Sequence, residues 1–215
     1  MKTIIFLPIC IFITTVCSQP NQKINFDTPL LKKYFTETER LVLAKMVQFT
    51  DSLVLANTKE TQVEEAYHVY LDTIYELLKN GGSMNYSFNE PEKQAFLFNL
   101  DTTFFNKIWE KSIPKIVHTK DTDLYYPENF YTLSLNYKGE YLKYLKEKGM
   151  ENDFYKSIHE NIESAGDISP VVFGNFLLKH RELNFGDSEN RLWASVFILR
   201  MEDPIELKVK RYLAR

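Results

Sequence analysis

Residues 188–201, SENRLWASVFILRM, form the most apolar run of the chain outside its first 18 residues. Leu192, Val196 and Leu199 recur at helical spacing, and apolar residues also fill the neighbouring positions, so the predicted helix is hydrophobic on almost every side. A helix of this kind is buried over most of its surface. We therefore predict that residues 188–201 form a central helix around which the rest of the chain packs.

Both ends of this predicted helix carry boundary signals. Asp187 or Ser188 can cap the N-terminus, and Glu189 suits the positive end of the helix dipole. Arg200 suits the negative end, and Pro204 prevents the helix from continuing. The limits of the helix thus follow from signals that are independent of its hydrophobic pattern.

The remaining sequence predicts further helices. The sequences TETE at 36–39 and TQVE at 61–64 are capping boxes that open helices reaching to about residues 56 and 80. The chain has only 7 Gly, and most of them fall at predicted helix ends, which disfavours a fold built on many tight turns. We predict an all-α, single-domain bundle of about eight helices over residues 29–215. A degenerate α-α solenoid, stacked from the short helix pairs after residue 139, is the alternative.

Residues 112–136 give the weakest helical signal. The run 112–127 contains Pro114 and the polar sequence HTKDTD, and we predict a long surface loop there. The sequence FYTLSLN at 130–136 alternates apolar and polar residues as a strand does, yet Pro127 and Glu128 before it can open a helix. So short a run leaves strand and helix open.

Residues 1–18 have the pattern of a secretory signal peptide. Lys2 supplies the positive start, and residues 4–13 supply an apolar segment of the usual length. That segment is shorter than the roughly 20 apolar residues that a membrane-spanning helix needs, and charges interrupt every later candidate. We therefore expect an exported protein, periplasmic or secreted, with no transmembrane helix. The polar sequence QPNQKINFDT at 19–28 predicts a flexible N-terminal arm.

Two cleavage sites compete at the end of this segment. Val16 and Ser18 are small enough for signal peptidase to cut after Ser18. Alternatively, Cys17 is the lipidated cysteine of a membrane-anchored lipoprotein, because a Cys directly after the apolar segment resembles a bacterial lipobox. The resemblance is incomplete, since Thr14 and Val16 stand where a lipobox has Leu and a smaller residue.

Cysteine usage and charge restrict the function further. The chain has 2 Cys, Cys10 and Cys17, so residues 19–215 contain no disulfide or thiol chemistry, which favours a bacterial over a eukaryotic exported protein. The formal net charge of −3 becomes −4 once Lys2 is removed with residues 1–18. Charges of both signs are mixed along the chain, and we therefore do not expect nucleic-acid binding.

The sharpest metal hypothesis begins with Glu65 and His68. Their Glu-x-x-His spacing puts both side chains on one helix face, as in carboxylate-bridged di-iron bundles. His159 and Glu163, one helical turn apart, are the other half of the predicted site. They lack the second Glu-x-x-His that such bundles require, so an ordinary solvated helix face is the simpler interpretation. A metal-dependent enzyme using these four residues remains the alternative function.

Aromatic residues supply the second candidate site. Tyrosines gather between residues 125 and 144, and we predict that Tyr125, Tyr126 and Tyr131 contribute to a ligand-binding surface or groove, because Tyr is common at recognition surfaces. Helical spacing also allows ordinary core packing for much of this cluster.

The sequence contains no nucleophile elbow and no Gly-rich phosphate loop. We therefore predict no catalytic residue and no cofactor. The predicted function is a non-catalytic interaction or ligand-binding module of the bacterial cell envelope, whose partner is a protein or a small ligand.

Overall fold

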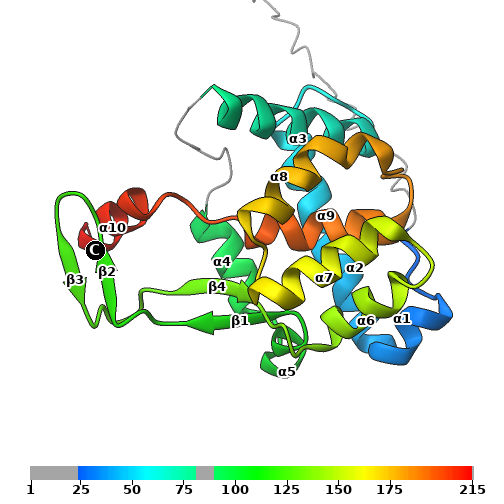
Figure 1. Ribbon diagram of the computed structural model, residues 1–215, viewed down its shortest axis with the longest axis horizontal. Coiled ribbons are helices and arrows are strands. Elements are labelled where there is room, and N and C mark those ends of the chain that lie inside the picture. Colours follow the sequence, from blue (N-terminus) through cyan, green and yellow to red (C-terminus); the bar gives the residue numbers. More distant parts are fainter. Residues whose placement is uncertain (1–23, 81–89, 215) are drawn as a thin grey trace, which may run out of the picture.

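The computed structural model describes residues 24–80 and 90–214, which form ten α-helices, one 3-10 helix and four short strands (Figure 1). The predicted signal peptide and Cys17 lie outside these residues. The helices are α1 (Pro29–Tyr34), α2 (Glu37–Ala56), α3 (Val63–Lys79), α4 (Glu90–Phe98), α5 (Thr102–Asn106), α6 (Glu140–Lys148), α7 (Asp153–Ala165), α8 (Pro170–Lys179), η1 (His180–Glu182), α9 (Ser188–Arg200) and α10 (Ile205–Leu213). The strands are β1 (Trp109–Ser112), β2 (Ile116–His118), β3 (Asp123–Tyr125) and β4 (Thr132–Leu135).

The predicted central helix is confirmed. The Asp187 side chain caps α9 by accepting the amide proton of Glu189, and the nine residues from Arg191 to Leu199 are all buried. Figure 1 shows α9 at the centre of the helical body, where it packs against α2. Burial on all sides is the consequence of apolar residues around the full circumference of the helix.

Aromatic side chains connect α9 to the later helices. The ring of Phe176 on α8 lies 5.6 Å from that of Trp193 and 4.5 Å from that of Phe197. In a solenoid each repeat contacts only its neighbours in sequence. Here α9 touches α2 as well as α8, so its contacts are not limited to its neighbours in sequence.

The two predicted capping boxes have different outcomes. Thr36 and Glu39 form the first one, with both reciprocal hydrogen bonds present at the start of α2. The second is wrong, because α3 begins at Val63 behind Gln62, which makes no side-chain cap. The side chain of Glu64 would have to reach back to complete this box. Instead it lies next to the loop that contains Gly186, with its Oε2 3.5 Å from the position that a Cβ on Gly186 would occupy.

The all-α prediction is wrong in part, because residues 109–135 form two antiparallel two-stranded sheets. Residues 130–136, where strand and helix were both open, contain β4, which pairs with β1 so that Trp109 lies opposite Leu135. Both side chains are buried, so the apolar positions of the alternating pattern face the core. The predicted surface loop at 112–127 is also wrong, since β2 and β3 form a hairpin within it.

This hairpin and α10 form a lobe at one end of the molecule (Figure 1). The lobe has a small hydrophobic cluster of its own, centred on Val117, Phe130 and Val209 and separate from the main core. The rest of the fold is organised around α9, whereas the lobe has a hydrophobic centre of its own. We call residues 113–130 together with α10 the hairpin lobe.

The described part of the segment predicted as a flexible arm, residues 24–28, packs at the start of α9. The amide of Asn25 donates to Ser188 Oγ at 3.0 Å, and the Thr28 hydroxyl donates to Glu189 Oε1 at 2.8 Å. Phe26 is buried in the main core. These contacts place the chain entry next to the N-terminus of the central helix.

Two glycines provide a matched test of this packing. A Cβ on Gly139 would lie 2.4 Å from the carbonyl oxygen of Lys107, whereas a Cβ on Gly174, in the middle of α8, would meet nothing within 4 Å. We expect Gly139→Ala to lower the free energy of unfolding by about 1–3 kcal/mol, because backbone must move. Gly174→Ala should raise it by roughly 0.5–1 kcal/mol through helix propensity. Urea denaturation of both variants measures the difference, and equal effects would contradict this packing.

Candidate interaction surface on the hairpin lobe

The structure separates the three predicted binding tyrosines. Tyr125 ends β3 with 64% of its surface exposed, and Tyr126 follows with 73% exposed. Tyr131 is half-buried, with its hydroxyl donating to Asn129 Oδ1 at 3.0 Å and its ring in edge contact with Phe98. Tyr125 and Tyr126 are therefore the most exposed of the three.

The core-packing interpretation holds for Tyr141 and Tyr144 but not for Tyr137, which is exposed. Tyr141 and Tyr144 on α6 are both buried, and their ring centroids lie 5.7 Å apart. The Tyr144 hydroxyl donates to Glu189 Oε2 at 3.0 Å, and burial is the main cause that raises the pKa of Tyr144 far above its ordinary value. The tyrosine cluster thus includes buried residues on α6 and exposed residues on the lobe.

The hairpin directs alternate side chains to two faces. Val117 and Leu124 form a cross-strand pair that packs toward α10 as part of the lobe's hydrophobic cluster. Ile116 pairs with Tyr125 one position along, and both are exposed. Because side chains of a strand alternate between faces, this apolar pair lies on the face away from α10. A polar pair is typical of a solvent-facing position, so an exposed Ile–Tyr pair is unusual there.

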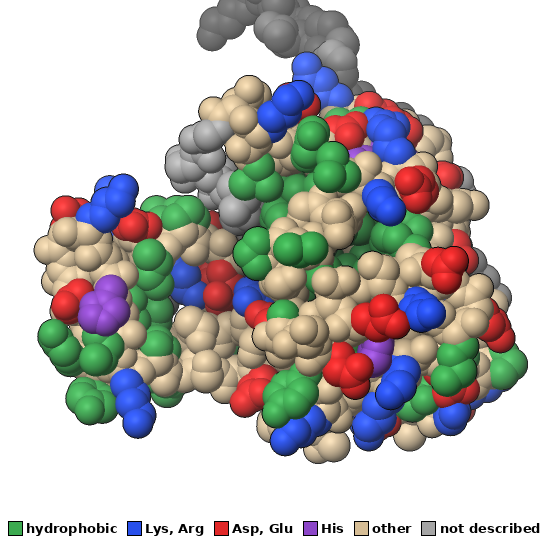
Figure 2. All heavy atoms as spheres, viewed as in Figure 1, with side chains coloured by type: hydrophobic (Ala, Val, Ile, Leu, Met, Phe, Trp, Pro, Cys, Tyr) green, Lys and Arg blue, Asp and Glu red, His purple; other side chains and the backbone are tan. Residues whose placement is uncertain are grey.

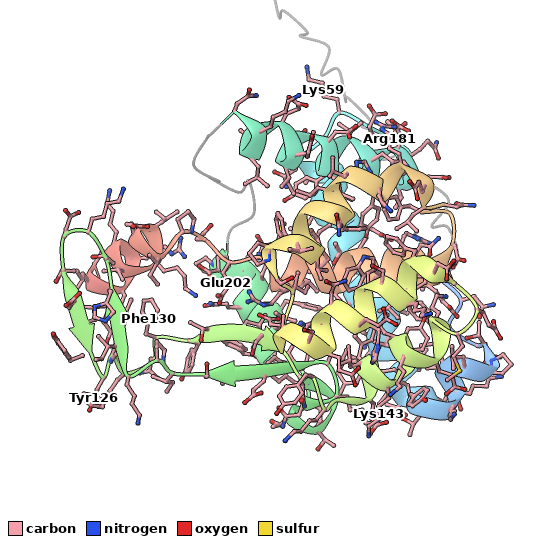
Figure 3. All side chains as sticks on the ribbon, in the orientation of Figure 1. Lys59, Tyr126, Phe130, Lys143, Arg181 and Glu202 are labelled. Atoms are coloured by element: carbon pink, nitrogen blue, oxygen red, sulfur yellow. The ribbon has the colours of Figure 1, made fainter. Side chains whose placement is uncertain are left out.

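Tyr126 has a strained backbone. Its φ is +49°, in the left-handed region that a bulky side chain rarely adopts. The amide of Tyr126 donates to the carbonyl of Lys115 at 2.7 Å, and this bond closes the open end of the hairpin. Tyr126 is the more exposed of the two tyrosines, and Figure 3 labels its place on the lobe. Strain of this kind concentrates at functional sites.

Ile113 adds a fourth exposed apolar side chain, 52% exposed, at the bend between β1 and β2. We call Ile113, Ile116, Tyr125 and Tyr126 the hairpin patch. In the space-filling view, green hydrophobic side chains gather on this lobe beside blue Lys or Arg side chains (Figure 2). Contiguous exposed apolar side chains rimmed by charge mark sites of interaction.

A buried charged cluster joins the lobe to the helical body. Lys208 and Arg211 on α10 pair with Glu90 at the start of α4, the Lys208–Glu90 distance being 3.1 Å. Arg211 also pairs with Asp203 at 2.5 Å. Burial raises the pKa of Glu90, and it lowers the pKa of the neighbouring Lys93 to about 8. These pairs fix α10, and with it the hairpin patch, against the body.

The four residues of the predicted metal site do not converge. His68 contacts His180, with their Nδ1 atoms 3.0 Å apart, and Glu65 lies 3.9 Å from Arg181. His159 faces Glu163 on its own helix at 4.0 Å. In residues 24–80 and 90–214, no group of three or more His, Cys, Asp or Glu is placed to hold a metal ion. Sequence spacing identified His68 but missed its partner, because that partner comes from η1.

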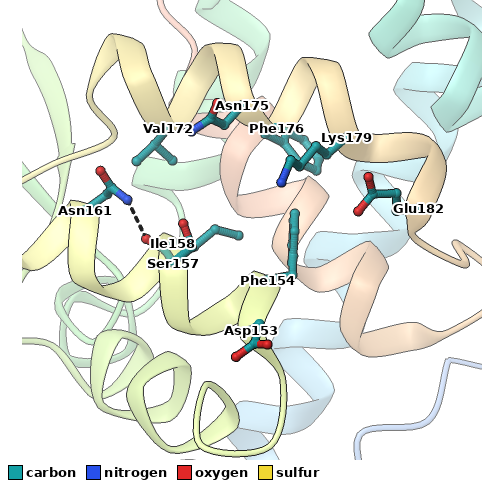
Figure 4. Close-up of a pocket in the computed structure, with 10 residues that line it drawn as sticks. All are labelled: Asp153, Phe154, Ser157, Ile158, Asn161, Val172, Asn175, Phe176, Lys179 and Glu182. Atoms are coloured by element: carbon teal, nitrogen blue, oxygen red, sulfur yellow. Dashed lines mark hydrogen bonds between the residues drawn. The ribbon is translucent and has the colours of Figure 1, made fainter.

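A groove lies between α7 and α8 and measures about 210 Å³ (Figure 4). Its floor includes Phe154, Ile158 and Phe176, and its polar rim includes Lys179 and Glu182. No residue of this groove was singled out by sequence reasoning, because its side chains come from two helices and share no motif.

Comparison of the chain with protein-family models, with curated proteins and with solved structures finds no match. Across the helices that the structure describes, none combines the length and the apolar character needed to cross a membrane.

Proposed function

We propose that this protein is a non-catalytic binding module that recognises a protein partner through the hairpin patch. The observation that carries the proposal is the exposed Ile116–Tyr125 pair beside the strained and exposed Tyr126. A sequence under selection only for folding would place polar side chains on that face and Gly or Asn at that φ.

The chemistry of the patch fits a polypeptide. Tyrosine combines a large apolar ring with a hydroxyl and is enriched among the residues that dominate protein–protein binding energy. Among the described strands, β2 and β3 pair only with each other, so the backbone of each has an unpaired outer edge. A partner strand can hydrogen-bond to such an edge while its side chains pack on the tyrosines.

The cellular location of the protein is part of the same proposal. The signal-peptide pattern of residues 1–18 and the absence of cysteine after Cys17 support an exported protein of a bacterial cell envelope. If Cys17 is lipidated, the module is anchored at a membrane surface; if cleavage follows Ser18, it is free. Native mass spectrometry of the protein from its own host distinguishes a chain that starts at Gln19 from an acylated one.

Site-specific photo-crosslinking tests the patch. We expect p-benzoylphenylalanine in place of Tyr126 to crosslink one partner protein in the cells that make this chain. The same probe in place of Met150, which is 76% exposed on the helical body, is the matched control and should not capture that partner. Equal capture from both positions, or capture only of a second copy of this chain, would contradict the proposal.

Tyr126→Gly then separates binding from folding. Glycine adopts positive φ without strain, so this variant should be at least as stable as the wild type. Loss of the ring should weaken binding of the captured partner by about tenfold or more, as expected for an aromatic hot spot. Isothermal titration calorimetry measures the binding change, and an unchanged affinity would overturn the assignment of this surface.

A further inference from the structure

Two buried histidines face each other on the side of the molecule away from the hairpin patch, near the Arg181 label in Figure 3. His68 on α3 and His180 at the start of η1 place their Nδ1 atoms 3.0 Å apart. His180 Nε2 lies 2.9 Å from Asp72 Oδ1, and Arg181 pairs with the other oxygen of this carboxylate. A chain of hydrogen bonds therefore runs from Arg181 through Asp72 and His180 to His68.

Hydrogen-bond geometry fixes where the protons lie in this chain. Hydrogen bonds with Arg181 and His180 lower the pKa of Asp72 despite desolvation, so Asp72 accepts and His180 Nε2–H donates. A neutral His180 then has a bare Nδ1, which accepts the proton on His68 Nδ1. In this arrangement His68 Nε2 is unprotonated. The tautomers of both rings thus follow from Asp72, which accepts the hydrogen bond of His180 Nε2–H.

The pair has room for only one added proton. A first proton on His68 Nε2 leaves the His68–His180 hydrogen bond intact. A second would put N–H groups on both Nδ1 atoms, 3.0 Å apart with no acceptor between them. Two adjacent imidazolium charges would also repel each other and Arg181, while Asp72, Glu64 and Glu65 would offset part of that repulsion.

We propose that His68 and His180 form an acid-sensitive latch that holds η1 against α3 at neutral pH and releases it when both rings become protonated. The latch sits where it can alter a binding surface, because Lys179 and Glu182, on either side of His180, line the groove between α7 and α8 (Figure 4). Release of η1 displaces that end of the groove. The pair acts as a proton device and not as a metal centre, since no third ligand converges on it within residues 24–80 and 90–214.

The direction of the pH effect follows from burial. Desolvation lowers the pKa of His68 and of His180 below the ordinary value of 6.5, and the charge of the neighbouring ring lowers that of His68 further. The unfolded chain then binds more protons than the folded one as the pH falls through 6.5. The stability that the latch contributes is complete above pH 6.5 and is lost as acid drives the folded pair to protonate.

Hydrogen exchange at pH 7.5 and pH 5 tests the latch. After correction for intrinsic exchange rates, amides of residues 176–187 should exchange about tenfold faster, or more, relative to those of α6 at the lower pH. His68→Asn removes one of the two titratable rings, and its side-chain amide can donate to neutral His180 or accept from protonated His180, so the acid effect should disappear. His159→Asn, which replaces a buried histidine on α7 that contacts neither ring, is the matched control and should keep it.

Imidazole ¹⁵N spectra of the wild type test the latch without any variant. At pH 7.5 they should show His180 protonated at Nε2 and His68 protonated at Nδ1. The opposite tautomers, uniform exchange at pH 5, or an acid effect that survives in His68→Asn would each overturn the proposal. The hairpin patch is not involved in any of these measurements, so the latch and the proposed function fail independently.

Discussion

Asp51→Ala should lower the free energy of unfolding by about 3–5 kcal/mol, as expected when one partner of a buried ion pair is removed. Asp51 on α2 accepts a hydrogen bond from Arg191 Nη1 at 2.9 Å, and the Arg191 side chain is only 1% exposed. The guanidinium has no other acceptor among the described residues, because its Nε and Nη2 atoms are buried without a partner. Chemical denaturation measures the loss.

The double replacement Asp51→Leu with Arg191→Met is the informative control. Both charges are then absent, and buried ion pairs replaced by apolar residues of similar size often change stability by only about 1 kcal/mol or increase it. Tyr67 loses its acceptor Asp51 but keeps Ser195 Oγ at 3.3 Å. A double variant as unstable as Asp51→Ala would show that the pair itself, and not the unpaired Arg191, determines the cost.

The central helix was predictable because its signal is local. Nine buried residues in succession require apolar side chains at every turn, and capping by Asp187 requires only neighbouring residues. The first capping box, at Thr36, is local in the same sense. By contrast, Arg191 is a charged residue within the buried run, and its partner Asp51 lies 140 positions away. Local pattern placed the helix but gave no sign of the ion pair inside it.

The strands were missed for a physical reason of a different kind. β4 is four residues long, and its alternating pattern is compatible with a helix until a partner strand is known. That partner is β1, which begins at Trp109, shortly after α5 ends at Asn106. Pairing between β1 and β4 buries Trp109 against Leu135, and this tertiary contact outweighs local propensity.

The candidate sites also combine features that local sequence predicts with features that depend on tertiary contacts. Tyr125 and Tyr126 could be named from sequence because they are adjacent, whereas their exposure follows from the hairpin register. Glu-x-x-His spacing identified His68, but helical periodicity only predicts partners on the same helix. His180, 112 positions away, comes from a different element. The contact between His68 and His180 joins two elements that are far apart in sequence, so only the tertiary structure could reveal it.

The second large effect is expected at the aromatic centre of α9. Trp193 is fully buried, with its ring 5.6 Å from that of Phe176 and 6.1 Å from that of Phe197. Trp193→Ala should lower the free energy of unfolding by about 3–5 kcal/mol, because it removes apolar contact and leaves a cavity at the centre of the bundle. Urea denaturation monitored by far-UV circular dichroism measures the change.

Trp193→Phe separates packing from hydrogen bonding at the same site. The indole Nε1 is buried and has no acceptor among the described residues, so the tryptophan already bears the cost of an unsatisfied donor. Phenylalanine removes that donor and keeps much of the ring contact, and we expect a loss of only about 1–2 kcal/mol, smaller than the alanine effect. If the two variants were equally destabilised, the indole N–H would have to be bonded, and the packing around α9 would differ from that described. A small loss instead identifies shape, and not polarity, as the contribution of Trp193 to the central helix.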